Sequence, residues 1–344
     1  MRNFAYARAA NAEQAVAAAA RGAAIIAGGT EFLNWMRLGI ADADKVVDIS
    51  GIDQLRDIAL DANGIRIGAL ATLNQIGESE IVRTSAPVLA EACLKAASAQ
   101  LRNRATIGGN ILQKTRCPYF RAEAPVANAM PWPCNKRVRG SGCAAKDSRY
   151  PRLALFGWND ACVATQPSDP AVALAVLDAI VEVVGLDGRR SIPVTEFHLS
   201  QQDAAKVHPD RNEVAAIESR LRPAELIESF HVPVDAASRR SVYLKVRERE
   251  SYEYAMVSAA GALELDGGRM RTVRIALGSV AQKPWRLTQA EAALRGQPLE
   301  ANALDRALDA ALSSAHPLPG NEFKVTLARN AARQALLSAG GGDD

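Results

Sequence analysis

Residues Thr106–Phe120 read "TIGGNILQKTRCPYF", and the interpretation of the whole chain starts from this stretch. Its two adjacent glycines let backbone N–H groups approach a ligand closely, because glycine has no side chain and accepts positive φ angles. A few residues later Cys117 precedes a proline, as at the beginning of a metal-binding loop. One short segment therefore combines a candidate nucleotide turn with a candidate metal ligand.

A second glycine pair lies near the N-terminus, in "GAAIIAGGTEFLNWMRLGI". This sequence predicts a short strand ending at Ala27, a turn at Gly28 and Gly29, and a helix with Thr30 as its N-cap and Glu31 in its first turn. The segment "LRNRATIGGNIL" predicts a loop, a turn and a strand. A helix that starts after a glycine turn favours a phosphate at its N-terminus.

The two glycine turns leave two interpretations open. Backbone amides from both turns could hold a diphosphate, with Asn110 as an additional donor and acceptor. The alternative is plain turn geometry. Neither motif is G-x-G-x-x-G followed by an acidic residue, and neither is a phosphate-binding loop ending in Gly-Lys-Ser/Thr, so the known nicotinamide and P-loop fingerprints are absent.

Length and composition indicate a soluble globular protein of two or three domains. The chain has 344 residues, 48% hydrophobic and 23% charged, with a formal charge of +3. We identify no signal peptide and no run of apolar residues long enough to cross a bilayer, so we expect no membrane insertion. The last residues, "SAGGGDD", predict a flexible tail over 339–344.

The basic character is concentrated between Lys114 and Arg152, where nine Lys or Arg face only Glu123 and Asp147. This gives the segment a charge of +7 and leaves −4 for the rest of the chain. The surrounding stretch is rich in proline and has little periodicity, so we interpret residues 114–165 as an insertion with a purpose of its own. It contains no recognisable nucleic-acid-binding motif, and we expect no nucleic-acid partner.

Four of the five cysteines fall inside this insertion, with the spacing C-x16-C-x8-C-x18-C. They are Cys117, Cys134, Cys143 and Cys162. Four thiolates suit an iron–sulfur cluster or a structural zinc, although zinc sites usually contain close pairs such as C-x2-C. A basic loop would offset the negative charge of a cluster. Zinc, disulfides and unligated thiols remain open from the residues alone, whereas Cys93 fits a small core residue on a helix.

The remainder predicts further strands and helices. In "QPSDPAVALAVLDAIVEVVGLDGRRSIPV", Ser168 or Asp169 caps a helix that leads to two strands joined by an Asp-Gly turn. Beyond residue 240 we expect antiparallel strands with a hairpin at Asp266–Gly268, and then helices near 288–295, 301–314 and 321–338. The four histidines match no catalytic pattern and are expected on the surface or in loops.

Together, "AGGTEFL" and "TIGGNIL" resemble the paired signature of the FAD-binding subunit of xanthine dehydrogenase-type molybdenum hydroxylases. The insertion resembles that of the subgroup of aldehyde oxidoreductases with an additional [4Fe–4S] cluster. The resemblance implies an α+β protein: a two-subdomain FAD-binding fold of the vanillyl-alcohol-oxidase type over residues 1–225, and a small C-terminal domain with an antiparallel sheet and helices over 226–338.

The resemblance also implies roles for individual residues. The first FAD turn would comprise Ala27, Gly28, Gly29, Thr30 and Glu31, and the second Thr106, Gly108, Gly109 and Asn110. Four more residues match family positions near the flavin, namely Ser168 and Asp169 by the ribityl–phosphate region and Lys245 and Tyr254 by the ring. The ordinary alternatives are a helix cap for "PSD" and a plain strand aromatic for Tyr254. Cys117, Cys134, Cys143 and Cys162 would hold the [4Fe–4S] cluster.

The function implied is electron transfer in an oxidoreductase, without a catalytic acid or base on this chain. The partners implied are a large molybdenum-cofactor subunit and a small subunit with two [2Fe–2S] clusters, and electrons would leave through FAD to an external acceptor. Two alternatives are a zinc-stapled binding module without redox activity and a stand-alone flavin oxidase of the same fold. The compartment expected is cytoplasmic, or periplasmic if a partner subunit carries the export signal.

Overall fold

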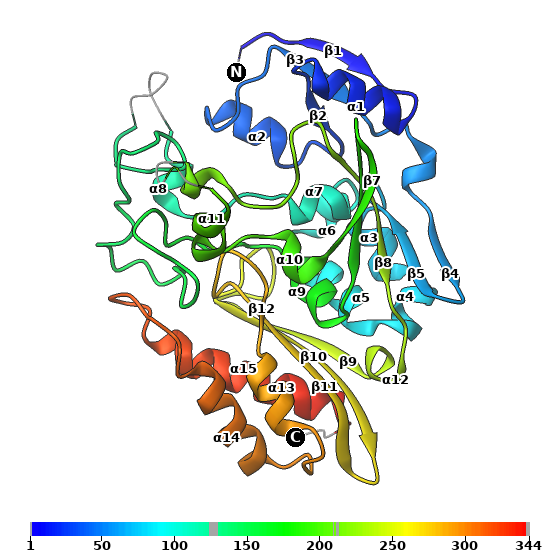
Figure 1. Cartoon of the computed structure of the whole chain (residues 1–344), viewed down its shortest axis with the longest axis vertical. Helices are drawn as coiled ribbons and strands as arrows, with labels where there is room; N and C mark the ends of the chain where they lie inside the picture. Colours follow the sequence, from blue (N-terminus) through cyan, green and yellow to red (C-terminus); the bar gives the residue numbers. More distant parts are fainter. Residues whose placement is uncertain (1, 124–129, 209, 211–212, 342–344) are drawn as a thin grey trace.

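The computed structural model describes residues 2–123, 130–208, 210 and 213–341. Figure 1 shows the chain running from a small N-terminal unit, through a central sheet with helices, to a C-terminal domain at the opposite end of the molecule. The expected α+β class is confirmed, because parallel and antiparallel sheets occur in separate parts of the chain, each with its own helices.

The N-terminal unit contains a parallel three-stranded sheet in the order β1-β3-β2. Its strands are β1 (Ala5–Arg8), β2 (Ala24–Ile26) and β3 (Lys45–Asp48). Helix α1 (Ala12–Ala20) connects β1 to β2, and the side chain of Asn11 caps it by accepting from the N–H of Gln14. Helix α2 (Phe32–Arg37) follows β2, so the first glycine pair lies between a strand and a helix, as expected.

The central sheet has five antiparallel strands in the order β4-β5-β8-β6-β7. They are β4 (Ile58–Asp61), β5 (Gly64–Gly68), β6 (Ile180–Gly185), β7 (Gly188–Pro193) and β8 (Leu226–Val232). The helices of this part are α3 (Leu73–Glu78), α4 (Glu80–Ser85), α5 (Pro87–Lys95), α6 (Ala99–Arg102), α7 (Ile107–Ile111), α9 (Asp169–Val176), α10 (Val194–Phe197) and α11 (Gln201–Val207). Helices α5 and α9 pack together in one core that includes Cys93, which confirms its role as a core residue.

The C-terminal domain begins after α12 (Ala236–Arg239) with a sheet in the order β12-β11-β10-β9. Its strands are β9 (Ser241–Val246), β10 (Val257–Asp266), β11 (Arg269–Gly278) and β12 (Trp285–Arg286). Helices α13 (Thr288–Leu294), α14 (Ala301–Leu312) and α15 (Phe323–Ala339) form a second core with it. The predicted hairpin is confirmed, since Gly267 and Gly268 both have positive φ angles between β10 and β11.

The insertion lies beside α11 at the left of Figure 1, and within its described residues only α8 (Pro118–Arg121) is regular helix. It has a small core of its own in which all four cysteines take part, together with Phe120 and Leu153. The prediction of an irregular, cysteine-bearing segment therefore agrees with the structure over its described part. Residues 124–129 of this segment lie outside the described residues, as do 342–344 of the expected tail.

Two local expectations were wrong. The segment "IGGNI" forms helix α7 rather than a turn and a strand, because the hydroxyl of Thr106 caps it by accepting from the N–H of Gly109. Helix α2 has Glu31 rather than Thr30 at its N-cap, without a side-chain capping bond. His198 lies outside the helices and strands, as expected of a loop residue, but it is 3% exposed and its Nε2 lies 2.7 Å from the carbonyl oxygen of Ile111.

The boundary expected after residue 225 falls directly before β8, which pairs with β5 and β6 in the central sheet. We propose that the first domain continues through β8 and that the boundary lies in the short segment between β8 and β9. No helix among the described residues combines the length and apolar character needed to span a bilayer.

Candidate functional site

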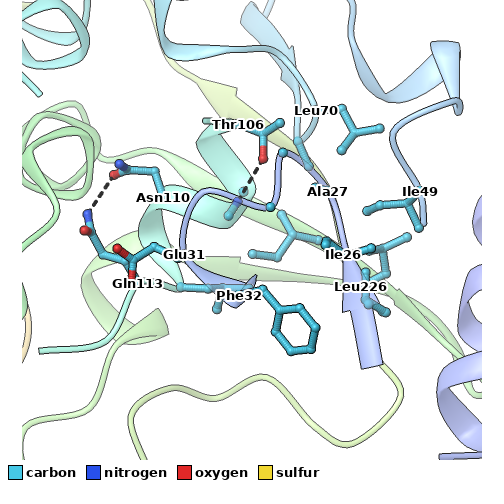
Figure 2. Close-up of a pocket in the computed structure, with 18 of the residues that line it drawn as sticks. Ile26, Ala27, Glu31, Phe32, Ile49, Leu70, Thr106, Asn110, Gln113 and Leu226 are labelled. Atoms are coloured by element: carbon cyan, nitrogen blue, oxygen red, sulfur yellow. Dashed lines mark hydrogen bonds between the residues drawn. The ribbon is translucent and has the colours of Figure 1, made fainter. Parts of the chain in front are cut away.

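A cavity of about 360 Å³ lies where β2, α7 and β8 meet, a size within the usual range for small-molecule sites. One end is apolar, with walls formed by Ile25, Ile26, Ile49, Leu70 and Leu226. The other end contains both glycine motifs. Figure 2 shows Glu31, Asn110 and Gln113 on one side of the cavity, Ile26, Ile49 and Leu226 on the other, and Thr106 and Leu70 between them.

The first glycine turn offers free backbone donors to this cavity. Gly29 has a φ angle of +75°, the left-handed region that favours glycine. Among the described residues, none accepts a hydrogen bond from the N–H of Gly28, Gly29 or Thr30. Three successive unpaired N–H groups at a cavity wall match the acceptor-rich oxygens of a diphosphate.

The second glycine motif is different, because its amides are already bonded within the protein. The N–H of Gly108 donates to the carbonyl oxygen of Ala69 at 3.0 Å, and that of Asn110 to the carbonyl oxygen of Thr106 at 2.8 Å. A Cβ atom on Gly108 would approach Ala69 to 3.0 Å, so glycine is needed there for packing. This motif therefore shapes the cavity wall, and the first turn supplies the free amides.

Nine of the thirteen predicted flavin-site residues line this one cavity. They are Ala27, Gly28, Gly29, Thr30, Glu31, Thr106, Gly108, Gly109 and Asn110. The apolar wall was not predicted, because its residues come from four separate strands and loops and carry no motif. Contact with FAD stays a prediction for each of the nine.

The other four predicted residues lie just beyond the cavity. The hydroxyl of Ser168, which caps α9, donates to the side-chain oxygen of Asn110 at 2.6 Å. Next to it, the buried carboxylate of Asp169 accepts from Lys245 at 2.8 Å and from the hydroxyl of Tyr243 at 2.5 Å. Lys245 on β9 thus joins the C-terminal domain to the first turn of α9.

Tyr254 is not a strand residue, since it lies in the loop between β9 and β10. The guanidinium of Arg116 stacks on its ring at 4.4 Å from the centroid and also pairs with Glu31 of the first glycine turn. Burial raises the pKa of Tyr254 to about 12. The residue therefore lies one side chain away from the cavity wall.

The four insertion cysteines line a separate, smaller cavity. Cys134 and Cys143 are paired across an antiparallel bridge, and Cys162 is bridged to Asn159. None of the cysteines, all of which lie in the described part of the chain, forms a disulfide. Burial raises the pKa of Cys117 to about 12 and that of Cys162 to about 11, so both groups are neutral thiols at neutral pH in the absence of a ligand.

The described residues contain no group of three or more His, Cys, Asp or Glu side chains arranged to hold a single metal ion. The cysteines therefore share a cavity without forming a tight mononuclear site. The cavity that the four cysteines line has a volume of only about 10 Å³, so the arrangement of these side chains does not by itself identify a bound group.

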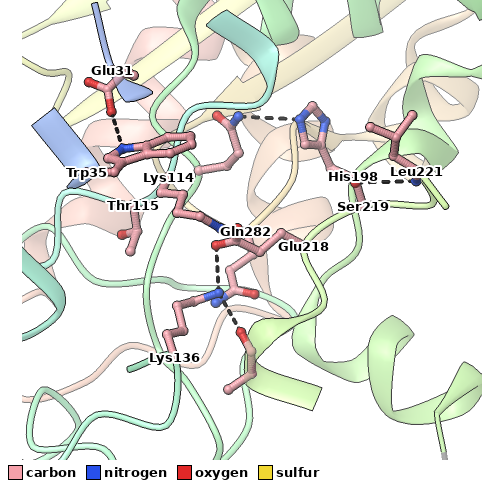
Figure 3. Close-up of polar contacts among 12 residues, drawn as sticks. Glu31, Trp35, Lys114, Thr115, Lys136, His198, Glu218, Ser219, Leu221 and Gln282 are labelled. Atoms are coloured by element: carbon pink, nitrogen blue, oxygen red, sulfur yellow. Dashed lines mark hydrogen bonds and ion pairs between the residues drawn. The ribbon is translucent and has the colours of Figure 1, made fainter. Parts of the chain in front are cut away.

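A second cavity of about 370 Å³ shares Trp35, Leu112 and Gln113 with the first and reaches Lys136 of the insertion. Figure 3 shows Glu218 between Lys114 and Lys136, with N–O distances of 2.6 Å and 2.8 Å. Burial alone would raise the pKa of Glu218, but the two lysines lower it to about 2. This ion bridge connects the segment after α7 to the cysteine loop.

Comparison with known proteins gives matches along the whole chain. The family described as "FAD binding domain in molybdopterin dehydrogenase" matches residues 2–235, and "CO dehydrogenase flavoprotein C-terminal domain" matches residues 242–339. The aldehyde oxidoreductase FAD-binding subunit PaoB of Escherichia coli (strain K12) is 39% identical over 98% of this chain and 99% of that protein.

The chain belongs to the FAD-binding subunits of the molybdenum hydroxylase family. It is also 25% identical to the putative xanthine dehydrogenase FAD-binding subunit XdhB of Escherichia coli (strain K12), over 93% of this chain and 90% of that one. A structure of carbon monoxide dehydrogenase from Hydrogenophaga pseudoflava matches with a TM-score of 0.74 and 26% identity, over 99% of this chain and 98% of that chain. These matches confirm the expected fold and place the chain among oxidoreductase subunits.

Proposed function

We propose that this chain is the electron-transferring flavoprotein subunit of a heterotrimeric molybdenum hydroxylase that oxidises aldehydes. The observation that carries the proposal is the cavity with three free N–H groups at Gly28, Gly29 and Thr30 and an apolar far end, which suits a dinucleotide. The likeness to an aldehyde oxidoreductase subunit over nearly its whole length supports the substrate class.

When bound, FAD would accept electrons one at a time and pass them on in pairs. This chain's own residues would bind the diphosphate at the first glycine turn and enclose the nucleotide between the apolar walls. The electrons would come from a large molybdenum-cofactor subunit through a small subunit with two [2Fe–2S] clusters. An external acceptor would receive them, in the cytoplasm or in the periplasm.

We further propose that Cys117, Cys134, Cys143 and Cys162 hold a [4Fe–4S] cluster. The observation that supports this is that all four cysteines of the insertion line one cavity. A cluster places several iron and sulfide atoms between its thiolates, so it holds them farther apart than one zinc ion does. Lys136 and Arg137 lie beside Cys134 and would offset its negative charge.

The test is to purify the chain with its partner subunits under anaerobic conditions and to measure FAD, iron and labile sulfide. A Cys143→Ser variant should lose the iron and sulfide of one cluster while keeping FAD. Cys93→Ala, which alters a cysteine in the core of α5, is the matched control and should lose neither. Zinc in place of iron, without flavin absorption, would favour the binding-module alternative.

The stand-alone oxidase alternative has its own test. The chain expressed without partners should bind FAD but show no turnover with aldehydes or N-heterocycles, since the substrate would bind on another subunit. Turnover by the isolated chain would contradict the electron-transfer proposal.

A further inference from the structure

Two partly buried arginines surround one carboxylate beside the large cavity. The guanidinium of Arg116 pairs with one oxygen of Glu31, and that of Arg121 donates to the other oxygen at 3.1 Å. Arg116 also donates to the side-chain oxygen of Gln113 at 2.9 Å. The side chains of both arginines are less than one-fifth exposed.

This group carries one positive charge that no described residue balances. Arg116 and Arg121 together bring two charges, and within the described part of the chain Glu31 is the only carboxylate that pairs with either. Nearby, Asp169 pairs with Lys245, whereas Lys114 and Lys136 share the single carboxylate of Glu218, so neither group supplies a negative charge to the arginines. In addition, Nε of Arg116 and Nη1 of Arg121 are buried without a hydrogen-bond partner. Unpaired donors on a buried cation indicate that an electron-rich group belongs nearby.

The position of this charge connects the two candidate redox sites. Glu31 and Gln113, both partners of Arg116, line the large cavity. The guanidinium of Arg116 covers the ring of Tyr254, and the next residue along the chain is Cys117 of the cysteine cavity. A single side chain therefore adjoins the nucleotide cavity, the C-terminal domain and the first proposed cluster ligand.

We propose that Arg116, supported by Arg121, is a positioning residue whose fixed charge raises the reduction potential of the flavin bound in this cavity. Reduction adds negative charge to a flavin, and a nearby cation attracts that charge more strongly through the protein, where the effective dielectric constant is lower, than it would through water. Glu31 opposes this effect and holds both guanidiniums in place. The inference rests on the proposed FAD site and adds the residue that tunes it.

The test measures the flavin midpoint potential by anaerobic redox titration of the intact complex, following flavin absorption. Arg116→Gln, which removes the charge but can still bond to Glu31, should shift the potential to a more negative value. Glu31→Gln should shift it to a more positive value. Arg116→Lys should restore much of the potential, because it keeps the charge while losing the stacked geometry.

A charge effect predicts that the two glutamine variants shift the flavin potential in opposite directions, because one removes a positive and the other a negative charge. A structural disturbance gives no reason for the two shifts to differ in direction. Arg139→Gln is the matched control, since Arg139 lies on the same insertion but is 62% exposed, and its variant should leave the potential unchanged. If FAD is present and the two variants shift the potential in the same direction, or not at all, the inference is wrong. If the unmodified complex contains no FAD, the proposed function fails instead. If Arg116→Gln fails to bind FAD, the other two variants still test the inference. A more positive flavin potential in Glu31→Gln, with a potential close to the parent's in Arg116→Lys, would support it, and a more negative potential in Glu31→Gln would contradict it.

Discussion

At the scale of single residues, the backbone at Gly28 runs so close to Arg104 that a Cβ atom on residue 28 would overlap the carbonyl oxygen of Arg104. Gly28→Ala must therefore displace the turn that presents the free N–H groups. Such overpacking costs about 1–3 kcal/mol, and a loss of that size in the binding free energy would correspond to roughly 5-fold to 150-fold in affinity. We expect weaker FAD binding, measured by fluorescence of the released flavin after dialysis.

Gly51→Ala is the control for this change, because a Cβ atom there meets nothing within 4 Å. The control should retain FAD as the parent does. Equal FAD retention by Gly28→Ala would show that the first turn does not hold the nucleotide.

The glycine motifs also show what the sequence could and could not predict at this scale. Both pairs were correctly expected to lie together, because each follows a recognisable local pattern. The helical form of "IGGNI" was missed, since glycine, asparagine and isoleucine are poor helix formers. Tertiary bonds override that tendency: the N–H groups of Ile107 and Gly108 donate to the carbonyl oxygens of Ala71 and Ala69.

At the scale of elements, Lys245 on β9 forms the buried link to Asp169 at the start of α9, with 2% and 7% of their side chains exposed. Lys245→Met would leave that carboxylate buried and without its cation, which costs about 3–5 kcal/mol. We expect a clear fall in the denaturant midpoint of the purified chain. Lys283→Met, which breaks the more exposed pair with Asp203, should cost less than about 1 kcal/mol.

Adding Asp169→Asn to Lys245→Met should recover part of the lost stability, because the unpaired charge is then gone. If Lys245→Met is no more destabilising than Lys283→Met, the pair does not hold α9 and β9 together.

The elements of the C-terminal domain could be predicted to within a few residues, since each has a strong period or a turn signal of its own. The helices expected near 288–295, 301–314 and 321–338 correspond to α13, α14 and α15. The partners of β8 could not be predicted, because its pairing with β5 and β6 joins segments far apart in the sequence. The apolar wall of the large cavity was missed for the same reason, because it combines residues of β2 and β8 with Ile49 and Leu70, which are far apart in the sequence.

At the scale of the whole molecule, the fully buried Lys324 connects the insertion to the C-terminal domain. Its ammonium group donates to the carbonyl oxygens of Leu153 at 2.8 Å and Ser279 at 2.7 Å. Burial, with a smaller contribution from Arg152, lowers the pKa of Lys324 to about 7. Between about pH 7 and the unfolded value near 10.5, the unfolded chain then binds more protons than the folded chain, so this residue makes stability rise with pH.

We therefore expect the stability of Lys324→Met relative to the parent to be greatest near pH 7. This relative stability should fall as the pH rises towards 9.5, because the parent becomes more stable over that range. The full pKa difference corresponds to roughly 3–6 kcal/mol, of which this range covers a part. The melting temperatures of the parent and of Lys324→Met, recorded at several pH values, measure this difference in stability. A difference between the two that stays constant with pH would contradict the assigned direction.

The two ends of the insertion meet at its base, where Ser168 bonds to Asn110 and the side-chain amide of Gln166 donates to the carbonyl oxygen of Ile111 at 3.0 Å. A short connection could therefore join α7 to α9 directly, and closing a gap between ends that already touch costs little conformational entropy. Ancestors of this protein could have acquired or discarded the whole thiol-bearing segment in one genetic event. The nucleotide-holding scaffold would have kept its shape throughout.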